Sequence, residues 1–502
     1  MNDMMLDRRS FLQQTAMGLC WLGGGRMLAV AAASPEDKPL LRFGVVSDIH
    51  FRLDFAKGKG LSPERDDRTF VHALEYFRDN GADAVMVCGD LADSGLVEEL
   101  ETVAAAWNKV FPGDKAPDGR RVERLFVTGN HDLVGYTYAN CDKVARLYPD
   151  MAERKRHLLH SDMAAQWERI FGEPYSPAFV KTVKGYSFIG AHYANSSGEP
   201  TALPLIAEVG GKTDPEKPFF FFQHMHLRHT CYGCWAWGRD DGKATKALSA
   251  FPNAVAFSGH SHYSLVDERS VWQEAFTSFG AGSLSAMSQT YDEFPRQGFE
   301  NSVQPWGSHD KEINAAKVNP RIENASRQGL LVSVYPDRMV LARRDFQSDL
   351  SLGPDWVLPL PAASSQKPYA FDGRRKKMRA PQFAVGSAVA VARAEGETRG
   401  GEKKAVADVA FPPANAAADR VYLYEITAET EDGTETVPWR FIAGSYLCSK
   451  DDPRYARGMS CRIASDELPD ADRIRFRVRP AGWFGAHGRA IVSKWISRKD
   501  LI

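Results

Sequence analysis

Residues 40–50 read LLRFGVVSDIH, an apolar run that stops at a polar cluster containing an aspartate and a histidine. The same order of apolar run and polar cluster recurs four times. The mainly apolar runs 82–88, 122–127, 219–222 and 254–257 are followed directly by GDLAD, TGNHD, QHMH and SGHSH. Short apolar runs of this kind predict strands that are buried on both faces of a sheet.

The segment between the first two runs predicts a helix. Ser62 can cap its beginning, and Asn80-Gly81 ends it. Phe70, Leu74 and Phe77 are spaced to share one apolar face. The order strand, helix, strand predicts α/β layering. The polar clusters then lie at the carboxyl ends of strands, where open α/β sheets bind their ligands.

Composition and charge narrow the class of protein. The chain has 502 residues, of which 43% are hydrophobic and 25% charged, as in ordinary globular proteins and unlike disordered or collagenous chains. This length predicts two or three domains. A net charge of −1 excludes a chain-wide basic surface for nucleic acid or acidic lipid. No apolar stretch reaches the ~20 residues of a membrane span, so we expect no transmembrane segment.

The first 33 residues resemble an export signal rather than a folded element. Arg8 and Arg9 precede Phe11-Leu12 and a weakly hydrophobic region that ends in small residues at 31–33. This pattern is similar to a bacterial twin-arginine signal peptide. We therefore expect export to the periplasm or cell envelope. The alternative is an amphipathic first helix with a chance arginine pair.

The pattern changes towards the C-terminus. The alternation of runs and clusters fades before a polar, irregular segment, 286–326, which predicts a long loop. We therefore predict one α/β domain over residues 40–360, whose last two strands form a hairpin. Residues 361–381 predict a linker whose basic run is solvated. From 382 to 502 the apolar period becomes two, which predicts a small all-β sandwich of immunoglobulin-like type without a catalytic cluster.

Two cysteine pairs suit an oxidising compartment. Cys231 and Cys234 form a Cys-x-x-Cys pair, Cys448 and Cys461 lie 13 residues apart, and either pair could form a disulfide. Cys88 lies within an apolar run and is predicted to be buried.

The five polar clusters together supply a set of nitrogen and oxygen donors. The candidates are Asp48, His50, Asp90, Asn130, His224, His260 and His262. Such a set suits a pair of first-row divalent or trivalent metals, and its members tolerate iron, manganese or zinc. The absence of cysteine from the set argues against a structural zinc site.

These motifs occur in the order found in one enzyme family. They are Asp48-x-His50, Gly89-Asp90-x-x-Asp93, Gly129-Asn130-His131-Asp132, His224 and Gly259-His260-x-His262. Over residues 40–360 the chain resembles the calcineurin-like metallophosphoesterases. This resemblance implies two packed β-sheets flanked by helices, a four-layer αββα fold, with metals at the strand ends.

The resemblance also implies a role for each candidate. Asp48, His50 and His262 would hold one metal; Asn130, His224 and His260 would hold the other; and Asp90 would bridge them. His131 would contact the scissile phosphate and protonate the leaving group, and Asp132 would orient His131. Asp93 stands where purple acid phosphatases have a metal-binding tyrosine, which separates this chain from that branch.

One motif departs from the family pattern. The fourth motif of the family often reads His-x-Pro or His-His-Pro, whereas this chain reads His224-Met225-His226, without a proline. His224 follows the apolar run directly and is the preferred ligand, with His226 as the alternative. His192 also follows an apolar run, and either lines the site or packs in the core. Tyr136 and Tyr138 lie near ligands in the sequence, and either line a substrate pocket or are solvated.

The predicted function is that of an exported, metal-dependent phosphoric ester hydrolase. It would cleave mono- or diesters of small phosphorylated substrates by attack of a metal-bridging hydroxide on phosphorus. One alternative is a pyrophosphatase that acts on nucleotide or lipid-headgroup diphosphates. A second is a surface binding protein with a vestigial metal core. The sequence carries no signal for the oligomeric state.

Overall fold

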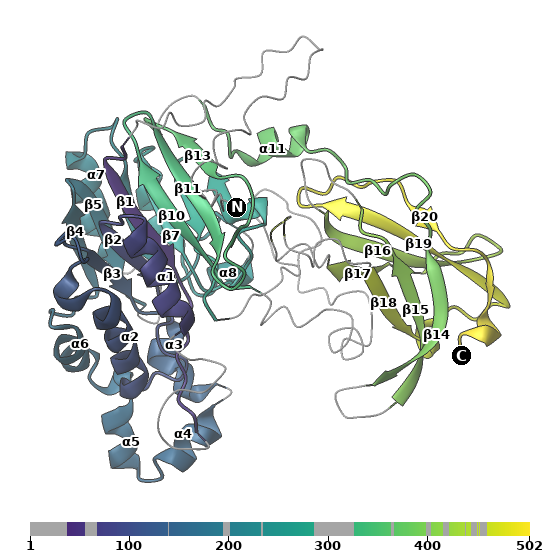
Figure 1. Cartoon of the computed structure of the whole chain (residues 1–502), viewed down its shortest axis with the longest axis horizontal. Helices are drawn as coiled ribbons and strands as arrows, with labels where there is room; N and C mark the ends of the chain where they lie inside the picture. Colours follow the sequence, from purple (N-terminus) through teal and green to yellow (C-terminus); the bar gives the residue numbers. More distant parts are fainter. Residues whose placement is uncertain are drawn as a thin grey trace, which may run out of the picture. The chain divides into compact units, whose positions relative to one another are not determined.

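The computed structural model describes residues 38–55, 68–138, 140–193, 201–231, 234–285, 326–362, 366–397, 403–414, 421–436, 438–442, 449, 451 and 459–502 (Figure 1). Residues 39–502 form one compact unit. The predicted export signal, the helix start at Ser62 and nearly all of the segment 286–326 lie outside the described residues. Among the helices described, none has the length and apolar character needed to cross a membrane.

The first sheet contains three of the predicted strands in parallel. Its strands are β1 (Leu41–Val46), β2 (Ala84–Cys88), β3 (Glu123–Val127), β10 (Gln328–Val334), β11 (Arg338–Asp345), β12 (Leu350–Ser351) and β13 (Trp356–Pro359). The order is β12-β11-β10-β1-β2-β3, and β13 pairs with β11. β1, β2 and β3 run parallel, so their carboxyl ends meet at one edge. β10 and β11 form the predicted closing hairpin.

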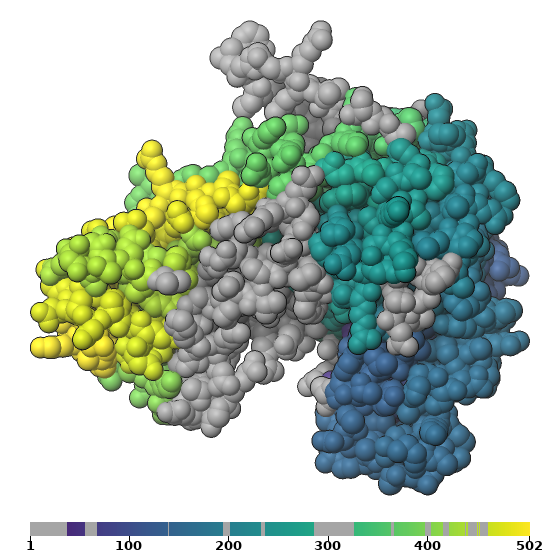
Figure 2. All heavy atoms as spheres, turned by 180° about the vertical axis from the view of Figure 1, so that it is seen from behind, coloured from purple at the N-terminus to yellow at the C-terminus, as the bar shows by residue number. Residues whose placement is uncertain are grey.

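The second sheet contains the remaining strands of the α/β domain. They are β4 (Ala178–Val183), β5 (Tyr186–Ala191), β6 (Phe219–Gln223), β7 (Ala254–Ser258), β8 (Val271–Gln273) and β9 (Thr277–Gly280). The order is β4-β5-β6-β7-β9-β8, with β5, β6, β7 and β9 parallel. Figure 2 shows the reverse face, on which the teal segment that carries β6 to β9 adjoins the blue segment that carries β3 to α6.

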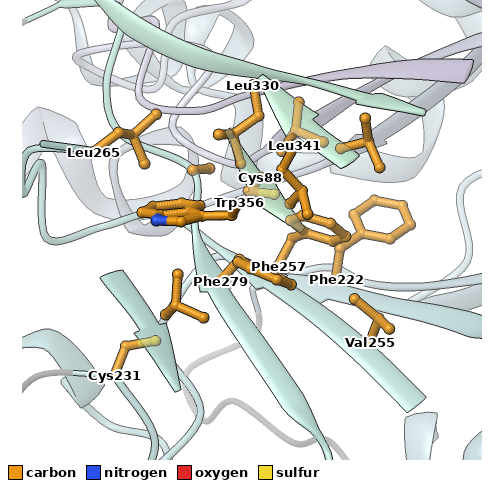
Figure 3. Close-up of a cluster of buried hydrophobic side chains, with 14 of the residues drawn as sticks. Cys88, Phe222, Cys231, Val255, Phe257, Leu265, Phe279, Leu330, Leu341 and Trp356 are labelled. Carbon is orange, nitrogen blue, oxygen red and sulfur yellow. The ribbon is translucent and has the colours of Figure 1, made fainter. Parts of the chain in front are cut away.

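Alternating side chains of each strand divide the domain into layers. Met86 and Cys88 of β2 face the second sheet, while Val85 and Val87 face the helices. The same alternation places Phe220 and Phe222 of β6 between the sheets and Phe219 and Phe221 on the outer side. Figure 3 shows the layer between the sheets, where Phe222, Phe257 and Phe279 lie near Leu330 and Leu341. The predicted two-sheet sandwich is therefore confirmed.

Helices cover the outer face of each sheet. α1 (Arg68–Asp79), α2 (Val97–Val110) and α6 (Met163–Phe171) pack on the first sheet, and α7 (Ala202–Lys212) and α9 (Lys243–Leu248) pack on the second. Phe70, Leu74 and Phe77 of α1 are buried, as their spacing predicted. The short helices α3 (Asn130–Val134), α4 (Cys141–Leu147), α5 (Met151–His157) and α8 (Cys234–Trp237) lie in the connections.

The C-terminal part consists of two antiparallel sheets, which are compatible with the predicted small β domain. One contains β14 (Ala390–Glu397), β15 (Lys403–Phe411) and β18 (Met459–Ala464). The other contains β16 (Val421–Thr430), β17 (Trp439–Ile442), β19 (Arg473–Gly482), β20 (Ile491–Val492) and β21 (Ile496–Ser497). Both sheets contribute to one apolar cluster. The predicted domain boundaries at 360 and 382 stay predictions.

The segment 361–381 is more structured than a free linker. It contains α11 (Phe371–Lys377), which carries the basic run. Arg374 donates to the backbone carbonyls of Glu268 and Val271, the latter at 2.7 Å. The interpretation of the whole run as solvated is therefore wrong for Arg374, because a guanidinium can satisfy carbonyls of a distant loop while its neighbours stay exposed.

Candidate metal centre

The predicted ligands lie at the carboxyl ends of strands from both sheets. Asp48 and His50 follow β1, Asp90 follows β2, and Asn130 begins α3 directly after β3. His224 follows β6, and His260 and His262 follow β7. The structure brings metal-ligating side chains together in three overlapping groups: Asp48, His50 and His262; His50, Asp90 and His131; and Asp48, Asp90 and His224.

In the first group three donor atoms converge. Asp48 Oδ1 lies 3.0 Å from His262 Nε2 and 3.7 Å from His50 Nε2, and the two Nε2 atoms are 3.1 Å apart. Asp48 is fully buried, and its Oδ1 accepts no hydrogen bond of normal geometry from the described residues. Such a buried oxygen is costly unless a cation or donor faces it. The donor set therefore fits a metal ion.

Asp90 belongs to both the second and the third group. Asp90 Oδ2 lies 3.1 Å from His224 Nε2 and 3.5 Å from His50 Nε2, so one carboxylate oxygen faces both groups. Asn130 Oδ1 lies 3.0 Å from His224 Nε2 on the same side. This position suits the predicted bridging role of Asp90, which stays a prediction.

The fifth motif contributes its other histidine less directly. The His260 ring packs against the His224 ring with centroids 5.2 Å apart, and the His260 backbone N–H donates to Asp48 Oδ2 at 3.0 Å. His260 belongs to none of the three groups above. His226, the alternative to His224, is fully buried with Nε2 2.9 Å from Ser261 Oγ, and it joins no such group among the described residues. The geometry thus favours His224.

Three of the four histidines predicted to be ligands contact the protein through their other ring nitrogen. Nδ1 of His50 lies 3.1 Å from Asp93 Oδ1, Nδ1 of His224 lies 2.8 Å from the Cys88 carbonyl oxygen, and Nδ1 of His262 lies 3.4 Å from Ser283 Oγ. A ring whose Nδ1 bonds outward presents Nε2 to the centre. Sequence reasoning missed these partners. The GDxxD motif marked Asp93 as a candidate partner, whereas nothing in the sequence marks the backbone carbonyl of Cys88 as a partner of His224.

The backbone at the site is strained. Asp48, His50, Asp90, His260 and His262 have φ between 50° and 65°, the left-handed region that side chains with a Cβ avoid. Each such residue costs roughly 1 kcal/mol or more, and this strain concentrates at functional sites. The turns that follow the strands therefore orient these side chains towards the cluster and lower the local stability of the backbone.

Two motif glycines are required by close approach. A Cβ at Gly129 would lie 2.8 Å from Asp90 Cγ and closer still to Asp90 Oδ1. A Cβ at Gly259 would collide with Ser47 Oγ and lie 2.6 Å from Asp48 Oδ2. Each glycine thus makes room for the carboxylate of another motif, which explains why glycine precedes the ligand in both.

Charges within the cluster are balanced by protonated histidines. Burial opposes the charged form of His50, but the nearby carboxylates of Asp48, Asp93 and Asp90 raise its pKa to about 10. Asp90 likewise raises the pKa of buried His224 to about 9. Burial would raise the pKa of Asp48, but His262 and its neighbours hold that pKa well below its ordinary value. A bound cation would replace these protons as the counter-charge.

A family match decides which class of domain this geometry belongs to. Residues 41–264 match the family model described as calcineurin-like phosphoesterase. This part of the chain belongs to the calcineurin-like phosphoesterase family. The sequence-based prediction of the family is confirmed, and the chain carries a metal-dependent phosphoesterase domain.

Solved structures of low similarity were also found. A dimetal phosphatase from Danio rerio is 12% identical, with 64% of this chain and 99% of that chain covered and a TM-score of 0.34. A purple acid phosphatase from yellow lupin (Lupinus luteus) seeds is 12% identical, with 66% and 56% covered and a TM-score of 0.40. Vps29 from Entamoeba histolytica complexed with Zn²⁺ is 9% identical, with 64% and 99% covered and a TM-score of 0.28. No curated protein matches this sequence.

Within the phosphoesterase domain, the orienting partner of His131 differs from the prediction. Nδ1 of His131 donates to the backbone carbonyl of Asp93 at 2.7 Å. Asp132 instead accepts the backbone N–H groups of Gly129 and Ala92, both at 2.7 Å, and of Leu91 at 3.2 Å. The predicted Asp132–His131 contact is therefore wrong, because three amides at the ends of β2 and β3 occupy the carboxylate. Asp132 therefore holds the backbone of the loops after β2 and β3 in the phosphoesterase domain and does not orient the His131 imidazole.

Other candidates separate into packed and site-lining residues. His192 is buried against Trp167 and Tyr175 and accepts the Thr128 N–H at Nδ1, so it is a structural histidine. Tyr138 lies against His131, with ring centroids 4.8 Å apart, and therefore lines the phosphoesterase site.

Cys231 carries a free, buried thiol, which argues against the Cys231–Cys234 disulfide. Cys448 lies outside the described residues, so the other pair is untested. Cys88 is buried as predicted.

Proposed function

We propose that this chain is a dinuclear-metal phosphohydrolase that cleaves phosphate mono- or diesters. One observation carries the proposal: a single oxygen of buried Asp90 faces His224 at 3.1 Å and His50 at 3.5 Å, between two groups of donors. A carboxylate shared between two groups of donors suits a pair of metals, and it lies in the part of the chain, residues 41–264, that matches the calcineurin-like phosphoesterase family.

The residues divide into two sets of ligands. Asp48, His50 and His262 would hold one ion; Asn130, His224 and His260 would hold the other; and Asp90 would contact both. When bound, the metal pair supplies Lewis-acid charge for the phosphoryl oxygens and activates water. The donors are nitrogen and oxygen atoms that suit iron, manganese or zinc. Elemental analysis of natively purified protein would identify the metal.

His131 is the proposed proton donor to the leaving group. Because its Nδ1 donates to the Asp93 carbonyl, Nε2 is the nitrogen that can carry the exchanged proton. Burial and the charge of His50 lower the pKa of His131, so its protonated form is a stronger acid, while a smaller fraction of the protein carries that proton at neutral pH. The backbone N–H of His131 donates to Asp90 Oδ1 at 2.8 Å and holds the imidazole beside the cluster.

The test is turnover of a chromogenic phosphoester by purified, metal-loaded protein. We expect Asp90→Asn and His131→Ala each to abolish turnover, whereas Asp118→Asn and His72→Ala, on the exposed surface, retain it. Wild-type rates in both site variants would overturn the proposal. Monoesters, diesters and diphosphates assayed side by side distinguish ester from pyrophosphate cleavage.

We also propose that the protein is exported by the twin-arginine route. The support is the sequence around Arg8 and Arg9. Cell fractionation should find the wild-type chain in the periplasm or envelope and the Arg8→Lys, Arg9→Lys double variant in the cytoplasm. Equal distribution of the two would refute export by this route.

A further inference from the structure

Tyr138 is an exposed aromatic residue that contacts two residues of the site at once. It follows the 3₁₀ turn Gly135–Thr137, and 42% of its surface is exposed. Its hydroxyl oxygen lies 3.3 Å from Asn130 Nδ2, and its ring meets the His131 ring edge-on at a centroid distance of 4.8 Å. An exposed tyrosine in contact with a predicted metal ligand and the proposed proton donor calls for a role beyond packing.

The hydroxyl contacts the Asn130 amide in the orientation that turns its oxygen to the cluster, and helps to hold the side chain there. The oxygen and nitrogen of an asparagine amide are almost identical in shape, but only the oxygen can bind a cation. Since an amide nitrogen donates and does not accept, the Tyr138 oxygen must accept from Nδ2. That bond supports the orientation in which Oδ1 faces His224 Nε2 at 3.0 Å.

The ring of Tyr138 borders the path of the leaving group. The leaving oxygen must approach Nε2 of His131 to receive its proton. Because the Tyr138 ring packs against that imidazole and is open to solvent, a group attached to the leaving oxygen would pass over it. An aromatic face suits an aryl or other apolar alcohol rather than a strongly hydrated phosphate leaving group.

We propose that Tyr138 is a positioning residue for Asn130 and the surface that receives the organic leaving group of a phosphoester. This inference rests on the proposed phosphohydrolase function and narrows its substrates to esters of apolar alcohols.

Two variants separate the roles of the hydroxyl and the ring. Tyr138→Phe removes only the hydroxyl, and Tyr138→Leu also removes the aromatic face. Tyr136→Phe is the matched control, because Tyr136 lies two residues away and stacks on His160, with centroids 4.8 Å apart. Thermal unfolding of all three should match that of the wild-type protein and thereby exclude misfolding.

The first readout is Mn²⁺ binding to metal-free protein by calorimetry, which does not depend on catalysis. We expect Tyr138→Phe to weaken one of two Mn²⁺ sites roughly tenfold, since partners that orient a ligand change metal affinity 10–100-fold. Tyr136→Phe should bind as the wild-type protein does. Unchanged Mn²⁺ affinity in Tyr138→Phe would overturn the positioning role.

The second readout is the division between kcat and KM at saturating Mn²⁺. For an aryl phosphoester we expect Tyr138→Leu to raise KM roughly fivefold over Tyr138→Phe, and for a methyl phosphoester we expect the two variants to agree. Equal KM values for the aryl ester would overturn the leaving-group role. If the wild-type protein cleaves no phosphoester, the proposed function fails, whereas the Mn²⁺ titration still decides the effect of Tyr138 on Asn130.

Discussion

The backbone carbonyl of Asp93 accepts a hydrogen bond from Nδ1 of His131 at 2.7 Å. The carboxylate of the same residue lies 3.1 Å from Nδ1 of His50. One residue thus holds the proposed proton donor through its backbone and a predicted metal ligand through its side chain. The carboxylate also lies 3.8 Å from His131 Nδ1, so a substitution removes this longer contact together with the contact to His50 but leaves the carbonyl in place.

The first prediction concerns the Asp93 side chain. Asp93→Ala should weaken Mn²⁺ binding about 10–100-fold, because the His50 ring loses the partner that orients it. At saturating Mn²⁺, kcat should return to within severalfold of the wild-type value, since the carbonyl still holds His131. Activity measured against Mn²⁺ concentration checks this, with Asp118→Ala as the surface control. A kcat that stays low at saturation would show that the carboxylate also acts on His131.

The second prediction concerns Gly129. Gly129→Ala should displace Asp90 and destabilise the domain by about 1–3 kcal/mol, the usual effect of overpacking. Gly211→Ala in α7 is the matched control, because a Cβ there meets no atom within 4 Å and alanine favours a helix. Denaturant unfolding and Mn²⁺ titration of both variants measure the difference. Equal stability of the two would mean that the strand ends yield more easily than their packing indicates.

The third prediction is a dependence of stability on pH through His192. Burial, with a smaller effect of Lys181, lowers the pKa of His192 from 6.5 to about 3. Between these values the unfolded chain binds a proton that the folded chain excludes, so stability is complete above pH 6.5 and falls as the pH drops towards 3. The contribution is about 1.4 kcal/mol per pH unit in this window.

His192→Gln tests this dependence, because it retains an acceptor for the Thr128 N–H and does not titrate. The free energy of unfolding of the variant, measured between pH 4 and 6.5, should decline less steeply with falling pH than that of the wild-type protein. Parallel slopes would contradict a neutral, buried His192.

The fourth prediction concerns the ion pair of Arg269 and Asp267. Both side chains are fully buried, their closest atoms are 2.6 Å apart, and the Arg269 guanidinium lies 4.2 Å from the centre of the Tyr422 ring. Arg269→Met leaves the Asp267 carboxylate buried without the Arg269 guanidinium, which costs roughly 3–5 kcal/mol. Arg78→Met removes an exposed pair with Asp79 and should cost at most about 1 kcal/mol. Similar unfolding midpoints for the two variants would contradict the burial of the pair.

Local pattern was sufficient for some parts of the protein and not for others. Side chains alternate between the two faces of β2 and β6, and Phe70, Leu74 and Phe77 share one face of α1. Both patterns follow from the period of the strand or helix alone, so the sequence predicts the layers and the strand ends. Parallel strands bring their carboxyl ends together, and for that reason the sequence alone places the ligand candidates near one another.

Side-chain partners across the fold were not predictable in this way. Asp132 directly follows His131, but the ends of β2 and β3 bring three backbone amides to its carboxylate first. Arg374 looked like one of four solvated cations, and only the position of the loop at 268–271 shows that it donates to carbonyls there. Such contacts depend on the position of backbone segments that are distant in the sequence, and the type of a single residue does not determine that position.

The donors of the candidate centre are divided between the two sheets, and this has a mechanical consequence. β1, β2 and β3 supply Asp48, His50, Asp90 and Asn130, whereas β6 and β7 supply His224, His260 and His262. Neither sheet alone offers a complete ligand set, so bound ions would fasten the sandwich across one rim. Metal binding would then depend on the packing of the two sheets against each other. A small displacement of one sheet relative to the other would first lower the metal affinity of the site.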